Sequence, residues 1–311
     1  MFTIVLLICY LALTSSVQRT VVVAGASGRV GREVVRALLS STLPGGTSVK
    51  VKALARNVGK AKEILSGADS RLEFVACDLQ SRAQVESAMK GADACIWCAS
   101  GFSDRSSKLD QLLGILKLKF FPATVIDVST VAQIASLLRE SSSAQGLVNG
   151  GPKFVLCSSA GVTRPAWSEA KKTTLVGAAD IPIVRLNPLN ILGVKCEGEK
   201  ALRESGVPYA VVRPCGLNDK WPQGRAVLSQ NDVAVGRANK MDVARVIVDC
   251  LASANATFKT FECFSLAGYA YPRDMDLQFS RLTPDKIIAA MSEVEEARMC
   301  QVQYQVSVER Y

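Results

Sequence analysis

The feature that most constrains the fold is a glycine-rich turn between an apolar run and an amphipathic stretch. Residues 21–24 are apolar, and residues 25–31 then read G-A-S-G-R-V-G. Gly25 lets the chain turn sharply off a strand, Gly28 lets backbone N–H groups approach a pyrophosphate, and Gly31 lets a helix pack closely on a sheet. Strand, glycine turn and helix in this order predict the entry to a dinucleotide-binding α/β fold.

The turn is expected to bind phosphate through the start of the helix that follows it. A helix at residues 32–40 is predicted because its apolar residues fall on one face. Its free N–H groups and partial positive charge would face the phosphates, with Ser27, Arg29 and Val30 in the binding loop. The G-x-x-G-x-x-G spacing differs from the G-x-G-x-x-G of long-chain dehydrogenases. A glycine-rich turn in another kind of α/β protein is the alternative.

Arg56 bears on the choice of cofactor. Residues 48–55 alternate as a second strand, and Arg56 follows it. NAD enzymes place Asp or Glu there to bind the ribose 2′-hydroxyl, but no carboxylate occurs between Glu33 and Glu63. Arg56 and Arg29 would bind a 2′-phosphate through charge-assisted hydrogen bonds. The sequence therefore favours NADP(H), and a solvated loop charge is the alternative for Arg56.

The remaining strands and helices alternate along the chain. Further strands are expected at residues 71–76, 94–99, 153–157, 209–213 and 258–266, and further helices at 61–66, from 81, at 124–138, 189–204, 242–251 and from 283. This order predicts a Rossmann-type doubly wound parallel sheet with helices on both faces and a small C-terminal extension on the substrate side.

Small and polar residues follow several of these strands, where a nucleotide would lie. Asp78 and Leu79 follow the third strand, and Asp78 would bind the adenine amino group or cap a turn. Ala99 and Ser100 are small enough to let a nucleotide lie across the end of the fourth strand. Residues 162–188 form a long irregular segment where a substrate lid would lie.

Three segments are expected from N- to C-terminus. Residues 1–18 would be a targeting segment, residues 19–275 an NAD(P)-binding Rossmann domain, and residues 276–311 a C-terminal helical extension. Residues 2–13 resemble the apolar region of a secretory signal peptide, although no positive region precedes them. They are too short to span a bilayer, so no stable membrane span is expected in the mature protein. A membrane anchor or an apolar strand is the alternative.

The predicted location follows from combining this segment with the cofactor. Free nicotinamide cofactors are intracellular, so a secreted NADPH protein would be unusual. Targeting through the secretory route to a complex plastid would reconcile the two. If the segment is not a signal, the expected location is the cytoplasm.

Composition excludes several kinds of chemistry. The chain has no histidine, which removes Ser-His-Asp and Cys-His nucleophiles and histidine metal sites. The net charge of +9 comes without long basic runs or many aromatic residues, so we expect an anionic ligand and not nucleic acid. Cys95 and Cys98 have C-x-x-C spacing inside an apolar run, and we interpret them as core thiols and not as a redox or zinc pair. No metal site is expected.

At this point the motifs resemble a known family, the atypical short-chain dehydrogenase/reductases of the NmrA-like, NAD(P)H-binding type. This branch includes flavin and biliverdin reductases, isoflavone-type reductases, redox-sensing regulators and plastid proteins tied to protein import or chlorophyll metabolism. The resemblance covers about residues 20–267. Its motifs are residues 25–31, Arg56, Cys77-Asp78-Leu79, Ala99-Ser100-Gly101, Ser158-Ser159-Ala160-Gly161, Lys195 with Glu199 and Leu202, residues 205–209, and Arg213-Pro214.

The resemblance implies a catalytic Tyr-x-x-x-Lys pair that is incomplete here. Lys195 matches the lysine that binds the nicotinamide ribose, but Ile191 stands where the family has its tyrosine. An isoleucine cannot transfer a proton. Ser158 or Ser159 matches the serine that polarises the substrate. An ordinary surface lysine is the alternative for Lys195.

The sequence leaves two main functions open. The first is an NADPH-dependent oxidoreductase that lacks the tyrosine of the pair and acts on an unknown small molecule. The second is a non-catalytic NADPH-binding scaffold or redox sensor that a protein partner reads. A sugar-nucleotide epimerase normally needs the tyrosine and fits least.

Overall fold

The computed structural model describes residues 18–41, 48–65, 69–100, 125–141, 144, 146–187 and 190–309. The segment predicted to be a targeting signal, apart from its last residue, lies outside these ranges, as does Gly101. The strands are β1 (Gln18–Ala24), β2 (Ser48–Ala55), β3 (Leu72–Ala76), β4 (Ala94–Trp97), β5 (Phe154–Cys157), β6 (Tyr209–Pro214), β7 (Gly216–Leu217), β8 (Gly224–Ser229), β9 (Arg237–Ala238) and β10 (Lys259–Ala267).

The helices follow the order expected for a doubly wound fold. They are α2 (Gly31–Ser40), α3 (Val58–Ile64), α4 (Arg82–Met89), α6 (Ile126–Glu140), α7 (Glu169–Thr174), α8 (Val176–Ala179), α9 (Pro182–Leu186), α10 (Ile191–Glu204), α11 (Lys240–Leu251), α12 (Met275–Ser280), α13 (Asp285–Ile288) and α14 (Glu293–Glu309), with 3₁₀ turns η3 (Arg164–Ala166) and η5 (Ala254–Ala256).

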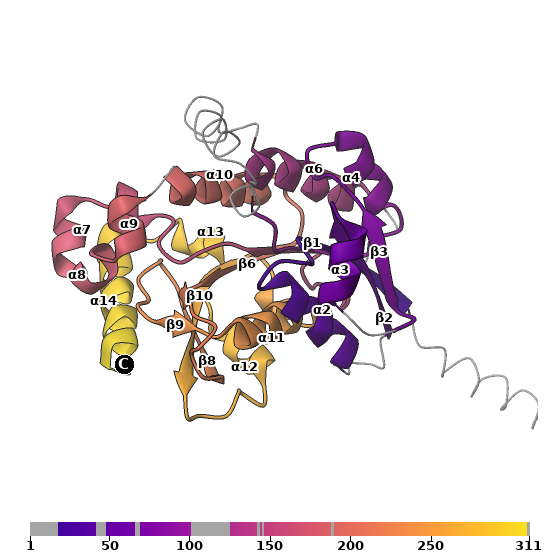
Figure 1. Cartoon of the computed structure of the whole chain (residues 1–311). Coiled ribbons are helices and arrows are strands. Elements are labelled where there is room, and N and C mark those ends of the chain that lie inside the picture. Colours follow the sequence, from indigo (N-terminus) through magenta and orange to yellow (C-terminus); the bar gives the residue numbers. More distant parts are fainter. Residues whose placement is uncertain are drawn as a thin grey trace, which may run out of the picture.

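One eight-stranded sheet runs through the molecule in the order β3-β2-β1-β4-β5-β6-β10-β8 (Figure 1). Every neighbouring pair is parallel except β8 and β10. The strand order reverses between β1 and β4, which is the topological switch point where such sheets bind ligands. The predicted Rossmann-type sheet and its seven strands are confirmed. The antiparallel edge strand β8 and the short β7–β9 pair were not predicted.

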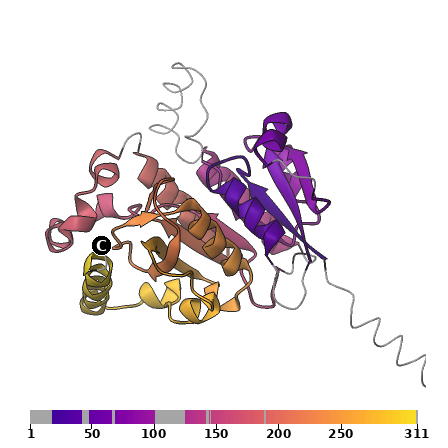
Figure 2. The same cartoon turned by 60° about the horizontal axis from the view of Figure 1, so that its bottom comes forward.

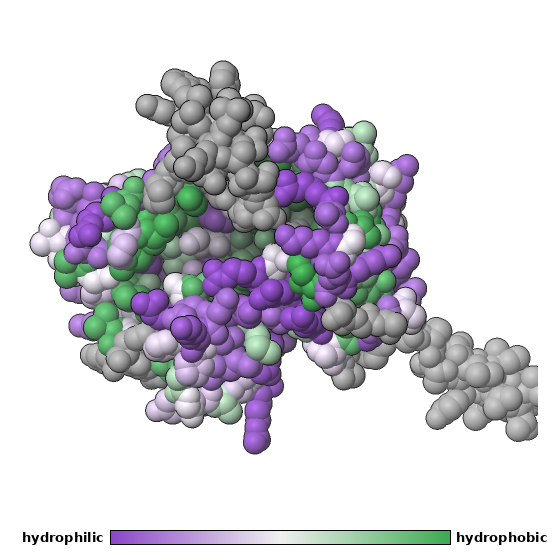
Figure 3. Space-filling model, in the orientation of Figure 1, coloured by the Kyte–Doolittle hydropathy of each residue, from purple (hydrophilic) through white to green (hydrophobic). Residues whose placement is uncertain are grey.

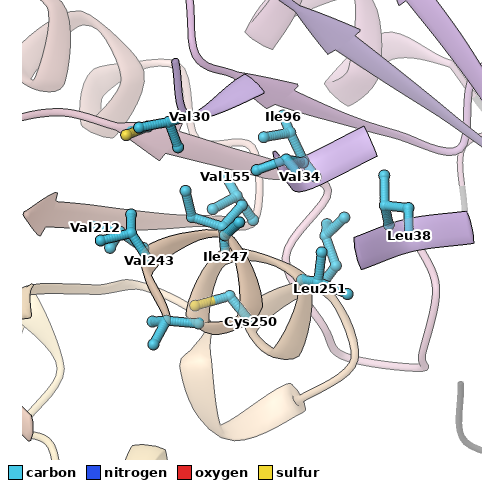
Figure 4. Close-up of a cluster of buried hydrophobic side chains, with 14 of the residues drawn as sticks. Val30, Val34, Leu38, Ile96, Val155, Val212, Val243, Ile247, Cys250 and Leu251 are labelled. Atoms are coloured by element: carbon cyan, nitrogen blue, oxygen red, sulfur yellow. The ribbon is translucent and has the colours of Figure 1, made fainter. Parts of the chain in front are cut away.

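Helices cover both faces of the sheet. On one face, α2 and α11 pack against inward side chains of β1, β4, β5 and β6 (Figure 4). On the other face, α4, α6 and α10 pack around Trp97 and Phe154. Buried apolar residues on both sides of a central strand explain why β1, β4, β5 and β6 read as continuous apolar runs.

Helix α10 lies unusually close to α6. A Cβ atom at Gly198 would overlap the carbonyl oxygen of Asp127 in α6. Only glycine permits this approach, so Gly198 fixes how α10 lies on the sheet. That placement matters because α10 carries Lys195.

The segment after β5 was predicted to be long and irregular, and that prediction is wrong. It folds into η3, α7, α8 and α9. Both views place α14 beside α7 and α8 (Figures 1 and 2), and Cys300 of α14 packs with Trp167, Leu175 and Ala178. The periodicity was hidden because each helix is only four to six residues long.

The C-terminal region, expected to be a helical extension over residues 276–311, contains the end of α12, then α13 and α14. The helix predicted from residue 283 is the short α13, and the longer α14 follows it. Within the described ranges, no helix is both long and apolar enough to cross a lipid bilayer.

Candidate functional site

The glycine turn lies against the ends of the two central strands. Gly25 has a φ of +77°, and a Cβ atom there would lie 2.6 Å from the backbone nitrogen of Ala99. A Cβ atom at Gly31 would overlap the carbonyl oxygen of Gly25. Both positions therefore require glycine, for the backbone conformation in one case and for close approach in the other.

The start of α2 is open to a ligand. Val30 precedes the helix, and no side chain caps it. Gly28 and Arg29 are exposed, Ser27 is partly buried, and the N–H of Gly28 donates to the Gly25 carbonyl at 2.9 Å. The N–H groups of Arg32 and Glu33 donate to the carbonyls of Gly28 and Val30 at 3.1 and 3.0 Å. A pyrophosphate would therefore meet the narrow glycine turn and the N–H groups that precede Arg32 at the positive end of the helix.

The two arginines expected to bind a 2′-phosphate lie in different surroundings. Arg56 directly follows β2 and is exposed. Arg29 is also exposed, but its Nη2 donates to Asp219 at 3.1 Å, and Lys240 lies 3.8 Å from the same carboxylate. Hydrogen bonding to Arg29 is the main reason that the pKa of Asp219 is lowered. Asp219 therefore competes with a phosphate for one of the five N–H donors of Arg29.

Asp78 has a structural role at the end of β3. Its Oδ1 accepts from the Gln80 N–H at 3.0 Å, and the Asp78 N–H donates to Gln84 Oε1 at 2.8 Å. Asp78 thus caps a turn, which is one of the two roles expected for it. The carbonyl of Leu79 accepts from Thr130 Oγ1 at 2.7 Å, which joins this turn to α6.

The candidate catalytic residues gather at the carboxyl ends of β4 and β5. Ser158 follows β5, and its buried side chain lies beside Glu199 of α10, whose pKa it helps to lower. Ser159 donates to the Ala160 carbonyl at 3.0 Å. Lys195 is partly exposed on α10, and Ile191 is the first residue of that helix. The charge of Lys195 acts on the thiol at the end of β5, which places it near this edge of the sheet.

A buried ion pair that we did not predict positions α10. Glu199 accepts two hydrogen bonds from Arg213 of β6, at 2.9 and 2.7 Å, and both side chains are buried. Burial alone would raise the pKa of Glu199, but Arg213 and Arg203 bring it below its usual value. Glu199 lies one helical turn after Lys195, so the pair fixes the rotation of the lysine's helix. Both residues belong to the family motifs, which was the signal available in the sequence.

A second buried arginine anchors the segment that follows β5, where a substrate lid was expected. Arg164 is fully buried and donates to the carbonyls of Asp232, Ala178 and Ala234 at 2.6, 2.9 and 2.7 Å. The Asp232 carboxylate accepts from the N–H groups of Gly161 and Thr163 at 2.6 and 2.8 Å. The chain after β5 is therefore fastened to the loop after β8. Nothing in the local sequence marks Arg164, because its partners are distant.

The part of the chain that the structure describes contains no cluster of side chains that could bind a metal ion. No three Cys, Asp or Glu side chains there come together in a way that could hold one.

Curated relatives of this chain include plastid proteins. An uncharacterized chloroplast protein of Arabidopsis thaliana is 29% identical over 259 residues, which are 80% of this chain and 78% of that protein. Protein TIC 62 of the pea chloroplast (Pisum sativum) is 28% identical over 248 residues, which are 73% of this chain and 39% of that protein. The chain therefore spans well under half of TIC 62.

Solved structures share the fold at low sequence identity. A short-chain dehydrogenase/reductase of Veillonella parvula in complex with NADP has a TM-score of 0.54 at 15% identity, covering 82% of this chain and 99% of that one. A putative NADH-flavin reductase of Streptococcus pneumoniae has a TM-score of 0.53 at 16% identity, and the match covers 80% of this chain and 100% of that one. At such identities the likeness establishes the fold alone.

The family itself is shown by a match that includes the glycine turn and most of the sheet. The model of the NAD(P)H-binding family matches residues 25–254, from Gly25 to the 3₁₀ turn after α11. This range contains the open start of α2 and the edge that carries Ser158 and Lys195. The chain belongs to the NAD(P)H-binding family.

Proposed function

We propose that this protein is an NADPH-dependent reductase that works without a tyrosine proton donor. The observation that carries the proposal is the arrangement of α10: Lys195 lies beside the sheet edge with Ser158, while Ile191 occupies the position four residues earlier. When bound, the cofactor supplies a hydride. Lys195 would hold the nicotinamide ribose, and Ser158 would donate a hydrogen bond to the substrate.

The missing acid limits the class of substrate. Reducing an isolated carbonyl leaves an alkoxide that needs a proton at once, and Ile191 cannot provide one. Flavins, quinones and tetrapyrroles spread the added charge over a conjugated system and can take the proton from water. The NADH-flavin reductase named for the Streptococcus structure supports this class.

The surface near the site suits a planar, apolar acceptor. Exposed apolar side chains gather around α9, at the left of Figure 3. They include Val176, Ile183 and Leu186, the last of which is 71% exposed. Val184 of α9 packs against Gly161, three residues after Ser158, so α9 borders the chain that leaves the end of β5.

NADPH oxidation with flavin, quinone and tetrapyrrole acceptors tests the proposal. We expect turnover with at least one acceptor, and Lys195→Ala should lower kcat/KM about tenfold or more because the ribose loses a charged hydrogen bond. Lys200→Ala, an exposed position on the same helix, should leave it unchanged. NADPH binding without turnover of any acceptor would refute the proposed reductase activity.

That outcome would favour the second candidate, a non-catalytic NADPH-binding scaffold or redox sensor. The observation favouring it is again Ile191, because binding the cofactor needs no proton donor. The relation to TIC 62, which is far longer than the matched segment, also suits a role in which a partner reads cofactor occupancy. NADPH-dependent capture of a plastid partner by the purified chain would test it.

We also propose a plastid location, reached through the secretory route in a cell with a complex plastid. The chloroplast relatives support the plastid, and the apolar residues 2–13 support the route. Residues 1–20 fused to a fluorescent protein should enter the plastid of such a cell. Fluorescence that stays in the cytoplasm would exclude this route.

A further inference from the structure

Two cysteines from different strands meet at the edge of the candidate site. Trp97 of β4 is the register partner of Leu156 in β5, so the next residues, Cys98 and Cys157, also lie opposite each other. Both side chains pack in the core layer on the α2 and α11 side.

Their spacing suits a disulfide without a shift of either strand. Neighbouring strands lie about 4.8 Å apart, and disulfides join Cα atoms about 4.4–6.8 Å apart. Cys95, which gave the C-x-x-C spacing with Cys98, packs on the opposite side of the sheet. The partner of Cys98 is therefore Cys157, 59 positions away in the printed sequence.

The surroundings make one of the two sulfurs the better nucleophile. Hydrogen bonding from Cys98 lowers the pKa of the Cys157 thiol, and the positive charge of Lys195 lowers it further. Burial raises the pKa of the same thiol, but the net shift is downward. The same hydrogen bond raises the pKa of Cys98. A thiolate is the attacking species in disulfide exchange. Cys98 is partly exposed, which gives a reagent access to the pair.

We propose that Cys98 and Cys157 form a reversible disulfide by exchange with a small-molecule disulfide, and that this bond weakens cofactor binding. The Cys157 thiolate attacks the small disulfide and releases one thiolate. The Cys98 thiol, losing its proton, then attacks the mixed disulfide and releases the second. The two protein thiols are oxidised by two electrons, and the small disulfide is reduced to two thiols.

The coupling to the cofactor follows from what lies next to Cys98, and it rests on the family's cofactor site being the glycine turn. The Cys98 N–H donates to the Ala24 carbonyl at 2.9 Å. The next residue, Ala99, is the one against which Gly25 packs. Closing the bond brings the two sulfurs to about 2.05 Å from each other, so the Cys98 side chain turns towards Cys157, and the backbone of Cys98 and Ala99 that packs on Gly25 turns with it. By linkage, bound cofactor opposes the closing of the disulfide.

Treating the purified full chain with oxidised glutathione tests the first half. After alkylation of the remaining thiols, mass spectrometry should find a peptide pair joined through Cys98 and Cys157 that separates on reduction. Cys98→Ser should stop at glutathione on Cys157, and Cys157→Ser should prevent both products. The Cys95→Ser variant, changed three residues before Cys98 on the opposite face of the sheet, should still form the bond. Free Cys98 and Cys157 after treatment of the wild-type chain would overturn the proposal.

A fluorescence titration with NADPH tests the second half. The oxidised chain should bind several-fold more weakly than the reduced chain, and saturating NADPH should slow disulfide formation by a similar factor. Equal affinity of the two forms would overturn the coupling. A reduced chain that binds no NADPH would instead refute the proposed function, while the joined peptide would still report on the disulfide.

Discussion

At the scale of single residues, Arg56 is the position on which the proposed preference for NADP(H) depends. It is exposed directly after β2, at the position where NAD enzymes have a carboxylate for the ribose 2′-hydroxyl. We expect Arg56→Ala to weaken NADPH binding about tenfold or more and to leave NADH binding unchanged, since a charged hydrogen bond contributes about 1.5–3 kcal/mol. Isothermal titration with both cofactors measures this. Lys60→Ala, exposed on the next helix, is the control, and an unchanged cofactor preference would refute the phosphate role.

Glu262 should make stability depend on pH. Its burial, with Asp232 nearby, raises its pKa to about 7 against the opposing charges of Arg213 and Arg164. Below the ordinary value of 4.5 both folded and unfolded states hold the proton, so there is no penalty. Between pH 4.5 and about 7 the unfolded state loses this proton while the folded state still holds it, so the free energy of unfolding falls as pH rises. Above about pH 7 both states have lost the proton, and the contribution of Glu262 is constant.

Replacing Glu262 with Gln removes this dependence. We expect Glu262→Gln to raise the free energy of unfolding above pH 7 by roughly 2–3 kcal/mol relative to the wild type, and to have little effect near pH 4.5. Urea unfolding at several pH values measures the difference. A difference between the two proteins that does not change with pH would show that Glu262 is ionised in the fold across this range.

At the scale of elements, α10 depends on its ion pair to β6. Glu199→Ala would leave Arg213 buried without its carboxylate, which costs about 3–5 kcal/mol. Glu199→Gln keeps a hydrogen-bond acceptor and should cost less. Glu197→Ala, exposed on the same helix, should change stability by no more than about 0.5 kcal/mol. Urea unfolding distinguishes them, and equal stability of the Glu199 and Glu197 alanine variants would contradict the positioning role.

Local pattern explains which elements could be predicted. The buried strands and the glycine turn are specified by short runs of sequence, so seven strands followed from local pattern, whereas the strand order came from the structure. The substrate-side helices are too short to show a period, and β8 is a six-residue edge strand with mixed burial. Helix α14 lies within the predicted C-terminal helical extension, but it was not separated from the helix expected at residue 283, because its apolar residues do not form one stripe. Several remain exposed, namely Val294, Val302, Val306 and Val308.

The candidate site was predictable only in part, for a related reason. The glycine turn could be predicted because the residues that form it are adjacent in the sequence. Arg29, by contrast, pairs with Asp219, which lies 190 positions away, and Arg164 binds carbonyls that lie 14 to 70 positions away. Register across the sheet, not spacing along the chain, paired Cys98 with Cys157. Such contacts have no signature in a single sequence.

At the scale of the whole molecule, the C-terminal helix supports the substrate side. Tyr304 Oη accepts from the Gly177 N–H at 2.9 Å, and Lys171 pairs with Glu296 at 2.8 Å. We expect Tyr304→Phe to speed hydrogen exchange of the Gly177 amide about fivefold, since one neutral hydrogen bond contributes about 1 kcal/mol. Val302→Ala on the exposed side of α14 should not. Unchanged exchange in both variants would mean that α14 does not restrain α8.

Arg164 has a consequence for how proteins of this kind diverge. Its three hydrogen bonds go to main-chain oxygens, which every amino acid possesses. Substitutions at exposed positions of α7, α8 and α9 can therefore accumulate without breaking the anchor, as long as the buried Trp167, Leu175 and Ala178 keep their packing. Related proteins can keep this segment in place while its exposed side chains differ, so binding preferences can change here at little cost in stability.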